Sequence, residues 1–132
     1  MELDITQGAL NLHFTKVKKD GTYSFLQNLG KNVNSANEEC APFLCDDERL
    51  LFFASNGFSG YGDYDLFYTV RLDDTWKKWS DPINLGPKIN TNSSEVSMFY
   101  DDESENLYYV GYKDEAYHLL KIGLPKKLLV AR

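Results

Sequence analysis

Short stretches of the chain alternate between apolar and polar positions with a period of two. Leu66, Tyr68 and Val70 illustrate this pattern, and segments rich in Asp, Asn and Gly separate one such stretch from the next. Alternation of this kind is typical of half-buried strands, and the spacing fits no helical period. We therefore expect an all-β protein with little helix.

One part of the chain contains a complete set of four such stretches. Acidic turns follow the first and the third, a Gly-rich segment follows the second, and the fourth leads through Pro82 to Leu85 and Gly86. Turn signals at this spacing favour short antiparallel strands connected in chain order. We predict these four strands at residues 39–44, 50–55, 65–72 and 76–79.

The chain repeats itself at a distance of 56 residues. Conservative matches, such as Tyr23 with Trp79, accompany the identical ones. Residues 12–15 match residues 66–69 at a distance of 54, so a length change lies in the intervening turn, where such changes are tolerated. The identical pairs are Ser24 and Ser80, Asn28 and Asn84, Leu29 and Leu85, Gly30 and Gly86, Asn34 and Asn90, Glu39 and Glu95, Phe43 and Phe99, Asp46 and Asp102, and Leu51 and Leu107.

The repeat predicts a single domain of residues 1–132 with units at approximately 9–30, 31–86 and 87–132. Positions that match in the repeat are expected to be equally buried: Leu29 with Leu85, Phe43 with Phe99, Leu51 with Leu107, and Phe53 with Tyr109. Strands of the incomplete outer units are expected at residues 11–17, 22–26, 95–99, 106–110 and 116–122, with a last strand in the tail at 126–130.

Three segments of the central unit carry a specific resemblance. They are residues 50–57 (LLFFASNG), 65–68 (DLFY) and 79–91 (WSDPINLGPKINT), with a glycine loop between the first two. In this order they resemble the TolB-type (WD-repeat-like) β-propeller repeat, in the form carried by bacterial cell-envelope proteins with OmpA-like peptidoglycan-binding domains. The resemblance covers roughly residues 9–123 and is strongest in the central unit. It implies four-stranded antiparallel propeller blades, a periplasmic, outer-membrane-associated or extracellular setting, and contact with protein or glycan.

The chain departs from this family in two respects. A closed propeller takes about four to eight blades, and this chain has about two and a half. The last unit also has the short connection 112–115 where the central unit has its glycine loop. Because each blade needs neighbours on both sides, a fragment or small divergent propeller-like domain ranks first and a homo-oligomer that completes the ring ranks second. A small two-sheet β-sandwich is a further alternative.

Composition and charge exclude several classes of partner. The 14% of aromatic residues favours strands over helices. A formal net charge of −6 disfavours nucleic acid and anionic membrane surfaces, and no apolar run is long enough for direct membrane insertion. The basic cluster of Lys126, Lys127 and Arg132 is interpreted as a solvated tail. Residues 1–4 are too polar to be the start of a secretory signal peptide. We therefore expect either a cell-envelope protein whose leader has been removed or, alternatively, a cytoplasmic protein.

The Gly-rich segment at residues 56–65 is the sharpest local signal of a binding site. Its glycines let the backbone approach a partner closely, while its carboxylates and rings offer contacts. A calcium loop is one interpretation, but the regular acidic spacing of a calcium hand is missing, so a connector between strands is favoured. Extra loop length on a rigid scaffold is where binding residues tend to lie. We predict, against the alternative of an idle insertion, that a ligand contacts Asn56, Phe58, Tyr61, Asp63, Tyr64 and Asp65.

Aromatic residues in and after this segment suggest a platform for a sugar or a peptide. Rings combine a large apolar area with polar groups. Trp79 shares its repeat position with Tyr23, so packing in the core is the favoured interpretation for Trp79. The candidate set is Phe58, Tyr61, Tyr64, Trp76 and Trp79.

The repeated Asn and Glu residues give little support to catalysis. Glu39 and Glu95 could act as paired carboxylates in glycoside cleavage, but they lie in successive repeats. Together with Asn34 and Asn90, they are expected to satisfy backbone groups of their loops. No nucleophile elbow, phosphate loop or dinucleotide fingerprint occurs either.

Histidine and cysteine spacing gives no sign of a metal site or a disulfide. His13 and His118 have no metal ligands at a suitable spacing. Cys40 and Cys45 would be roughly 16 Å apart in an extended strand, too far for a disulfide, so free and mostly buried thiols are expected. We expect no enzyme activity, no cofactor and no metal.

The favoured hypothesis is a non-catalytic binding or scaffolding module that contacts protein or cell-envelope polysaccharide. One alternative is a fragment of a glycan-cleaving propeller enzyme, sialidase-like or another glycoside hydrolase, because residues 73–76 and 79–82 bear a faint resemblance to Asp-box turns. Another is a structural unit that self-assembles through open strand edges.

Overall fold

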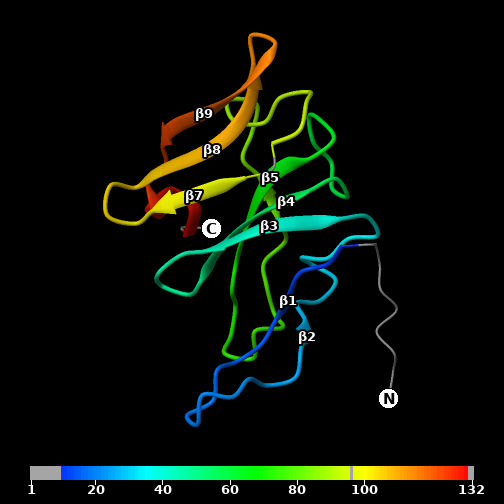
Figure 1. The fold of residues 1–132 in the computed structure, drawn as a ribbon, viewed down its shortest axis with the longest axis vertical. Helices are drawn as coiled ribbons and strands as arrows, with labels where there is room; N and C mark the ends of the chain where they lie inside the picture. The colour runs from blue at the N-terminus through cyan, green and yellow to red at the C-terminus, as the bar shows by residue number, and fades with distance from the viewer. Residues whose placement is uncertain (1–9, 96, 131–132) are drawn as a thin grey trace.

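The computed structural model describes residues 10–95 and 97–130, which form three antiparallel sheets and a short helix (Figure 1). Neighbouring strands in each sheet follow one another in chain order. Residues 1–4 and Arg132, used above for the leader and the basic tail, lie outside the described residues. The first sheet contains β1 (His13–Phe14) and β2 (Gln27–Asn28); the central sheet contains β3 (Glu39–Leu44), β4 (Leu50–Ser55), β5 (Asp65–Val70) and β6 (Ile83–Asn84); the third sheet contains β7 (Met98–Asp101), β8 (Asn106–Lys113) and β9 (Ala116–Gly123); and α1 (Lys126–Val130) follows.

Strand β4 is apolar on both faces and lies at the centre of the packing. Successive side chains of a strand point to opposite faces of its sheet. Leu50, Phe52 and Ala54 point to a core shared with the third sheet, whereas Leu51 and Phe53 point to a core shared with the first sheet. All six residues of β4 are buried. The central sheet therefore lies between the other two, as Figure 1 shows.

The core between the central and third sheets combines aliphatic and aromatic side chains. Phe52 packs against Tyr100 with ring centroids 5.3 Å apart. Partly buried Leu120 and Ile122 of β9 pack against the same core. Its buried members are Cys45, Leu50, Phe52, Ala54, Leu66, Tyr68, Ile89, Tyr100, Leu107, Tyr109 and Leu129.

A second core joins the first sheet to the opposite face of the central sheet. Phe53 and Phe67 stack with centroids 6.0 Å apart, and Phe58 meets Phe67 edge-on at 5.4 Å. The buried members of this core are Leu12, Leu29, Val33, Leu51, Phe53, Phe67 and Trp79.

The sequence repeat recurs in the strand register. Phe43 lies opposite Phe52 in the β3–β4 pair, and Phe99 lies opposite Tyr108 in the β7–β8 pair, 56 residues later. The prediction of equal burial is confirmed for Leu51 with Leu107 and for Phe53 with Tyr109, which are all buried.

The prediction of equal burial is wrong for the other two pairs. Phe43 is half-buried, whereas 54% of Phe99 is exposed, although the two rings meet edge-on with centroids 5.2 Å apart. Leu29 is buried in the second core, whereas Leu85 is half-buried and packs against the first core from its margin.

The predicted strands of the central unit are confirmed in part. The first two agree with β3 and β4 at both ends, and the third ends at Val70 instead of residue 72. The fourth strand is not at residues 76–79, because Trp76 has a left-handed backbone with φ 65° and Trp79 forms an isolated bridge with Arg71. The chain pairs with β5 again at β6, where Ile83 lies opposite Tyr68.

The outer units differ from prediction at their ends. In the first unit, pairing near residues 11–17 is limited to β1, and the strand expected at 22–26 is replaced by a Val17–Tyr23 bridge and by β2. Strand β7 begins at Met98, later than residue 95, whereas β8 and β9 occur where strands were expected and extend further.

The tail is a helix and not the expected last strand. Pro125 directly precedes α1, and proline favours a first helical turn. The backbone N–H of Lys126 donates to Glu105 Oε1 at 3.1 Å, and Leu129 is buried in the core. No helix among the described residues has the length and apolar character needed to cross a membrane.

Lys126 is not a solvated tail residue. Its Nζ lies 2.5 Å from Asp102 Oδ1 and 3.1 Å from Asp47 Oδ2. Burial alone would lower the pKa of Lys126, but its hydrogen bonds to Asp102 and Asp47 outweigh this and raise the pKa. Both carboxylates lie in turns that follow the first strands of successive repeats, so Lys126 joins α1 to both repeats.

The central position of β4 predicts the effect of truncating its side chains. Leu50→Ala should lower the free energy of unfolding by about 2–5 kcal/mol, because Leu50 is fully buried and its loss leaves a cavity. Leu72→Ala is the matched control, since Leu72 is exposed, and should change stability by less than about 0.5 kcal/mol. Urea denaturation of both variants measures the difference; equal effects would contradict this packing.

Candidate functional site

The Gly-rich connection between β4 and β5 packs closely against neighbouring loops. A Cβ atom on Gly57 would lie 1.8 Å from Ser35 Oγ, and one on Gly62 would lie 2.0 Å from the carbonyl oxygen of Ser93. Distances this short exclude a side chain at either position unless the neighbours move. The glycines are therefore required by contacts within the chain, as expected for a structural connector.

Asp65 shapes this connection from inside. Its carboxylate accepts hydrogen bonds from the backbone N–H groups of Tyr61 at 2.5 Å and Gly62 at 3.1 Å, and from Asn84 Nδ2 at 3.2 Å. The side chain is buried. Asp65 therefore holds the loop to the start of β5 and β6, and is not presented to a ligand at the surface.

The structure separates the other predicted site residues into two groups. Phe58 packs in the second core, while Asn56 Oδ1 accepts the N–H of Glu38 at 2.9 Å and the Tyr64 hydroxyl donates to Glu38. That hydrogen bond is the main cause that raises the pKa of Tyr64 to about 12. Tyr61 and Asp63 are exposed, and contact of these two with a ligand stays a prediction.

Metal-binding geometry is not found within the described ranges. No three or more His, Cys, Asp or Glu side chains of residues 10–95 and 97–130 gather in a way that could hold a metal ion. His13 Nδ1 and His118 Nε2 each lie within hydrogen-bond distance of a backbone carbonyl, and both cysteine thiols are free.

The repeated asparagines satisfy backbone groups, as the sequence predicted. Asn34 accepts the N–H of Leu12 at 2.7 Å and donates to its carbonyl at 2.8 Å. Asn90 makes the same two bonds with Leu66, at 2.7 and 2.9 Å. Each asparagine thus fastens the loop that follows one sheet to a leucine in or next to a strand of that same sheet.

The repeated glutamates are buried in equivalent positions. Oε1 of Glu95 accepts hydrogen bonds from Thr91 N at 3.1 Å and Thr91 Oγ1 at 2.5 Å, and Oε1 of Glu39 accepts the corresponding bonds from Ser35. Glu39 also accepts from Ser55 Oγ at 3.0 Å. Burial raises the pKa of Glu95, although the hydrogen bonds from Thr91 oppose the rise.

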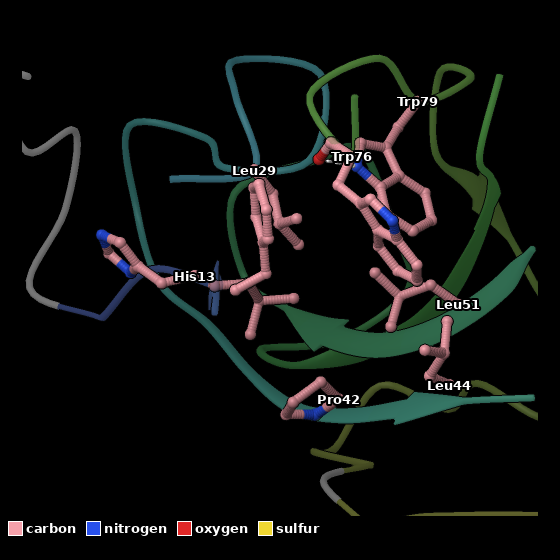
Figure 2. Close-up of a pocket in the computed structure, with 9 residues that line it drawn as sticks. His13, Leu29, Pro42, Leu44, Leu51, Trp76 and Trp79 are labelled. Carbon is pink, nitrogen blue, oxygen red and sulfur yellow. Dashed lines mark hydrogen bonds between the residues drawn. The ribbon is translucent and has the colours of Figure 1, made fainter. Parts of the chain in front are cut away.

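A cavity of about 230 Å³ lies between the first sheet and the central sheet (Figure 2), and of its lining the sequence pointed only to Trp76 and Trp79 as candidate binding residues. The exposed or half-buried residues Pro42, Leu44, Phe14 and Trp76 form part of its wall. Trp76 and Trp79 are the two tryptophans of the chain. The full lining is Leu12, His13, Phe14, Leu29, Pro42, Leu44, Leu51, Trp76 and Trp79.

Trp76 enters this wall from a strained turn. A left-handed φ of 65° is a genuine outlier for a bulky residue. The turn is fixed by Asp73 Oδ1, which accepts Thr75 N at 2.9 Å and Thr75 Oγ1 at 2.6 Å. The Arg71 guanidinium lies 4.5 Å from the centroid of the Trp76 ring, a cation–π distance.

Trp79 is the second aromatic part of the wall. It meets Trp76 edge-on with centroids 6.0 Å apart, and its indole N–H donates to the Trp76 carbonyl at 2.9 Å. Trp79 is buried, as expected, but 67% of its repeat partner Tyr23 is exposed. A shared repeat position is therefore not enough to predict burial. The two indoles contact each other because Trp76 and Trp79 are three residues apart in the same turn.

The cavity is suited to an apolar group. The one indole N–H of Trp79 is already bonded, and the remaining lining is formed mainly by aliphatic and aromatic carbon. Figure 2 shows the two indoles on one side, opposite Pro42 and Leu44 of β3, with His13 at the margin. Such a wall can enclose an aliphatic or aromatic side chain, and His13 is the one ionisable residue in its lining.

Comparison with known proteins gives no relative: no family model, no curated protein and no solved structure matches the chain.

The close packing of the Gly-rich connection predicts an asymmetry between its small residues. Gly62→Ala should lower the free energy of unfolding by about 1–3 kcal/mol, because the new methyl group meets backbone atoms of residues 91–93. Ser59→Ala, at an exposed position of the same connection, should change it by less than about 0.5 kcal/mol. Thermal denaturation compares the two variants, and a neutral Gly62→Ala would mean that the connection is not held against residues 91–93.

Burial of Glu95 predicts a specific pH dependence of stability. Its pKa is raised above the ordinary value of 4.5, so the folded chain keeps a proton that the unfolded chain loses. The stability gained from that proton is present below pH 4.5 and is lost as the pH rises through the folded-state pKa. Glu95→Gln should therefore become more stable relative to the wild type as the pH rises from about 4 to 7.

Urea denaturation across this pH range measures the difference between wild type and Glu95→Gln. Glu103→Gln, at an exposed position, controls for the loss of one formal charge. Parallel curves for wild type and Glu95→Gln would show that ionisation of Glu95 does not affect folding.

Proposed function

We propose that this chain is a non-catalytic binding or scaffolding module and that its cavity receives an apolar side chain of a protein partner. The observation that carries the proposal is the pair of indoles that lines the cavity beside β3 and β4. Binding energy at interfaces is concentrated in apolar or aromatic anchors that fill such pockets. At about 230 Å³ the cavity lies below the usual size for drug-like ligands, and this favours a single anchor.

Backbone strain at Trp76 supports this assignment. Holding a non-glycine residue in the left-handed region costs on the order of 1 kcal/mol or more. Strained residues cluster at binding and catalytic sites. The turn at Asp73 and the contact with Arg71 keep the Trp76 indole at the cavity in spite of that cost.

The lining favours a protein partner over cell-envelope polysaccharide. Recognition of a sugar needs hydrogen-bonding groups around the stacking ring, because hydroxyl groups that lose water without new partners are destabilising. The Trp79 N–H is taken by Trp76, so the indole N–H of Trp76 and the His13 ring at the margin are the polar side-chain groups left in an otherwise aliphatic and aromatic lining. Polysaccharide is the second candidate, and the experiment below separates the two.

The hydrogen bonds made by the buried carboxylates argue against a catalytic function. Glu39 and Glu95 each bind the loop of their own repeat, and Asp65 binds backbone N–H groups of the Gly-rich connection. Glycoside cleavage needs two carboxyl groups that face one bond. The fragment of a glycan-cleaving enzyme is therefore the weaker candidate.

We further propose that the three sheets are propeller-blade repeats of the TolB type. The support is the order of strands within each sheet, the stacking of sheets in chain order and the recurrence of the same loop hydrogen bonds in two repeats. The cell-envelope setting, with the cytoplasm as the alternative, rests on the same resemblance.

Tryptophan fluorescence can test the cavity directly, because both tryptophans line it. Short peptides with one central Leu or Phe should change the emission, whereas the same peptides with Ala at that position should not. Trp76→Ala should weaken binding by about 10- to 100-fold, with Trp79 still reporting. Trp76→Gly, which relieves the strained backbone, should weaken binding equally while the protein stays folded.

Phe25→Ala is the matched control, since Phe25 is an exposed aromatic residue that does not line the cavity, and it should bind as the wild type does. Cell-wall oligosaccharides form the second arm of the titration. A response to the oligosaccharides and not to the peptides would show that the ligand is a polysaccharide and not a protein. A response to neither would show that the cavity is not the site.

A further inference from the structure

A second cavity, of about 290 Å³, lies beside the cavity that the two indoles line. Leu29 lines the first cavity, while its chain neighbours Asn28 and Gly30 line the second. Trp76 likewise lines the first cavity, and Lys77 lines the second. Since consecutive Cα atoms lie about 3.8 Å apart, one extended peptide can reach both cavities. We call them the indole cavity and the polar cavity; the polar cavity is lined by Leu26, Gln27, Asn28, Gly30 and Lys77.

Backbone contacts hold the two walls of the polar cavity together. Asn32 Nδ2 donates a hydrogen bond to the Trp79 carbonyl at 3.0 Å. Gly30 lies so close to the other wall that a Cβ atom on it would be 3.3 Å from the carbonyl oxygen of Lys77. Because these contacts use main-chain atoms of residues 77 and 79, a change of the Lys77 side chain leaves the walls in place.

The linings of both cavities are free of carboxylates, although the chain has 20 Asp and Glu residues. Lys77 is the one ionisable residue in the lining of the polar cavity. The neighbouring Lys78 has its Nζ 3.9 Å from Asp73 Oδ2, whereas Lys77 forms no ion pair within residues 10–95 and 97–130. Lys77 thus presents an ammonium group that the described residues do not neutralise.

The part of the chain around the two cavities is positive, in contrast to the rest. Residues 10–35 contain four lysines and one aspartate, and Lys77 and Lys78 lie in the segment that packs against them. The formal net charge of the whole chain is −6. A positive region attracts acidic segments of a partner and disfavours basic ones. Charge complementarity therefore selects among the peptides that carry an apolar anchor.

We propose that the partner is an acidic peptide segment that occupies both cavities. Its apolar anchor enters the indole cavity, and the carboxylate of a residue next to the anchor pairs with Lys77 in the polar cavity. The amide of half-buried Gln27 lines the same cavity and can donate a hydrogen bond to that carboxylate. The assignment rests on the proposed function and adds to it the chemical class of the partner.

The exposure of Lys77 determines the size of the expected effect. An exposed ion pair changes affinity by roughly 2- to 5-fold, which is much less than an apolar anchor contributes. The anchor therefore supplies most of the affinity, and the carboxylate determines which anchored peptide is preferred.

Three peptides test the proposal in a titration followed by tryptophan fluorescence. They have blocked ends and one central Leu, and they differ only in the residues on both sides of it, which are Glu, Gln or Lys. The wild type should bind the Glu peptide roughly 2- to 5-fold more tightly than the Gln peptide, and the Lys peptide most weakly. Lys77→Glu should reverse this order. Added salt should reduce the differences, because it screens exposed charges.

Lys78→Glu is the matched control, because it makes the same change of net charge at the next residue, which is exposed and lines neither cavity. This variant should keep the order of the wild type, and circular dichroism establishes that both variants are folded. Equal binding of the three peptides, or reversal by Lys78→Glu as well, overturns the acidic partner but leaves the proposed function intact. Absence of binding for all three peptides overturns both.

Discussion

Burial of the central sheet on both faces is the constraint on which the rest of the structure depends. Strand β4 carries Phe52 toward one side and Phe53 toward the other, and each leaves water almost completely. Burial of a large apolar side chain contributes about 1.5–3 kcal/mol relative to its exposure. A sheet with such a strand needs a cover on each side, and the two outer sheets supply these covers from the preceding and following parts of the chain.

The repeated loops set the distance and order of the sheets. In each loop an asparagine, Asn34 or Asn90, binds both backbone groups of a leucine in the preceding sheet, while a glutamate holds the turn that leads into the next one. The asparagine side chains and Oε1 of each glutamate are buried and bonded, so they act as fixed links between apolar layers, whereas Oε2 of Glu39 and of Glu95 is buried without a hydrogen-bond partner among the described residues. Lys126 adds a further link between the turns that contain Asp47 and Asp102.

Residues with strong local signals were predicted well. Strands β3 and β4 were predicted at both ends because an apolar run is bounded by acidic and Gly-rich turns. Strand β6 was missed because it has two residues, and a pair that short leaves no period in the sequence. The helix α1 was taken for a strand because residues 126–130 are too few to distinguish the two periods, and its position depends on the contact of Leu129 with a distant core.

The candidate site was less predictable than the fold, since its residues come from separate parts of the chain. Leu12 belongs to the first unit, whereas Leu51 and Trp79 belong to the second, so the cavity forms only when the first two sheets stack. The Gly-rich connection had the clearer signal, yet Asp65 and its glycines are used for close packing within the chain. The strong local sequence pattern at residues 56–65 therefore belongs to a connector packed within the chain. The residues that line the cavity have no recognisable local sequence pattern apart from the two tryptophans.

The cavity has a physical cause in the unequal covers of the central sheet. On one side, the third sheet lays strands of four to eight residues against Phe52 and Leu66. On the other side, β1 and β2 pair over two residues each, so they cover only part of the face that carries Leu51. The turn with Trp76 and Trp79 fills part of the remaining space, and the unfilled part is the cavity. The thinly covered face can thus accept a side chain from outside without any loss of contacts made by β4 to the third sheet.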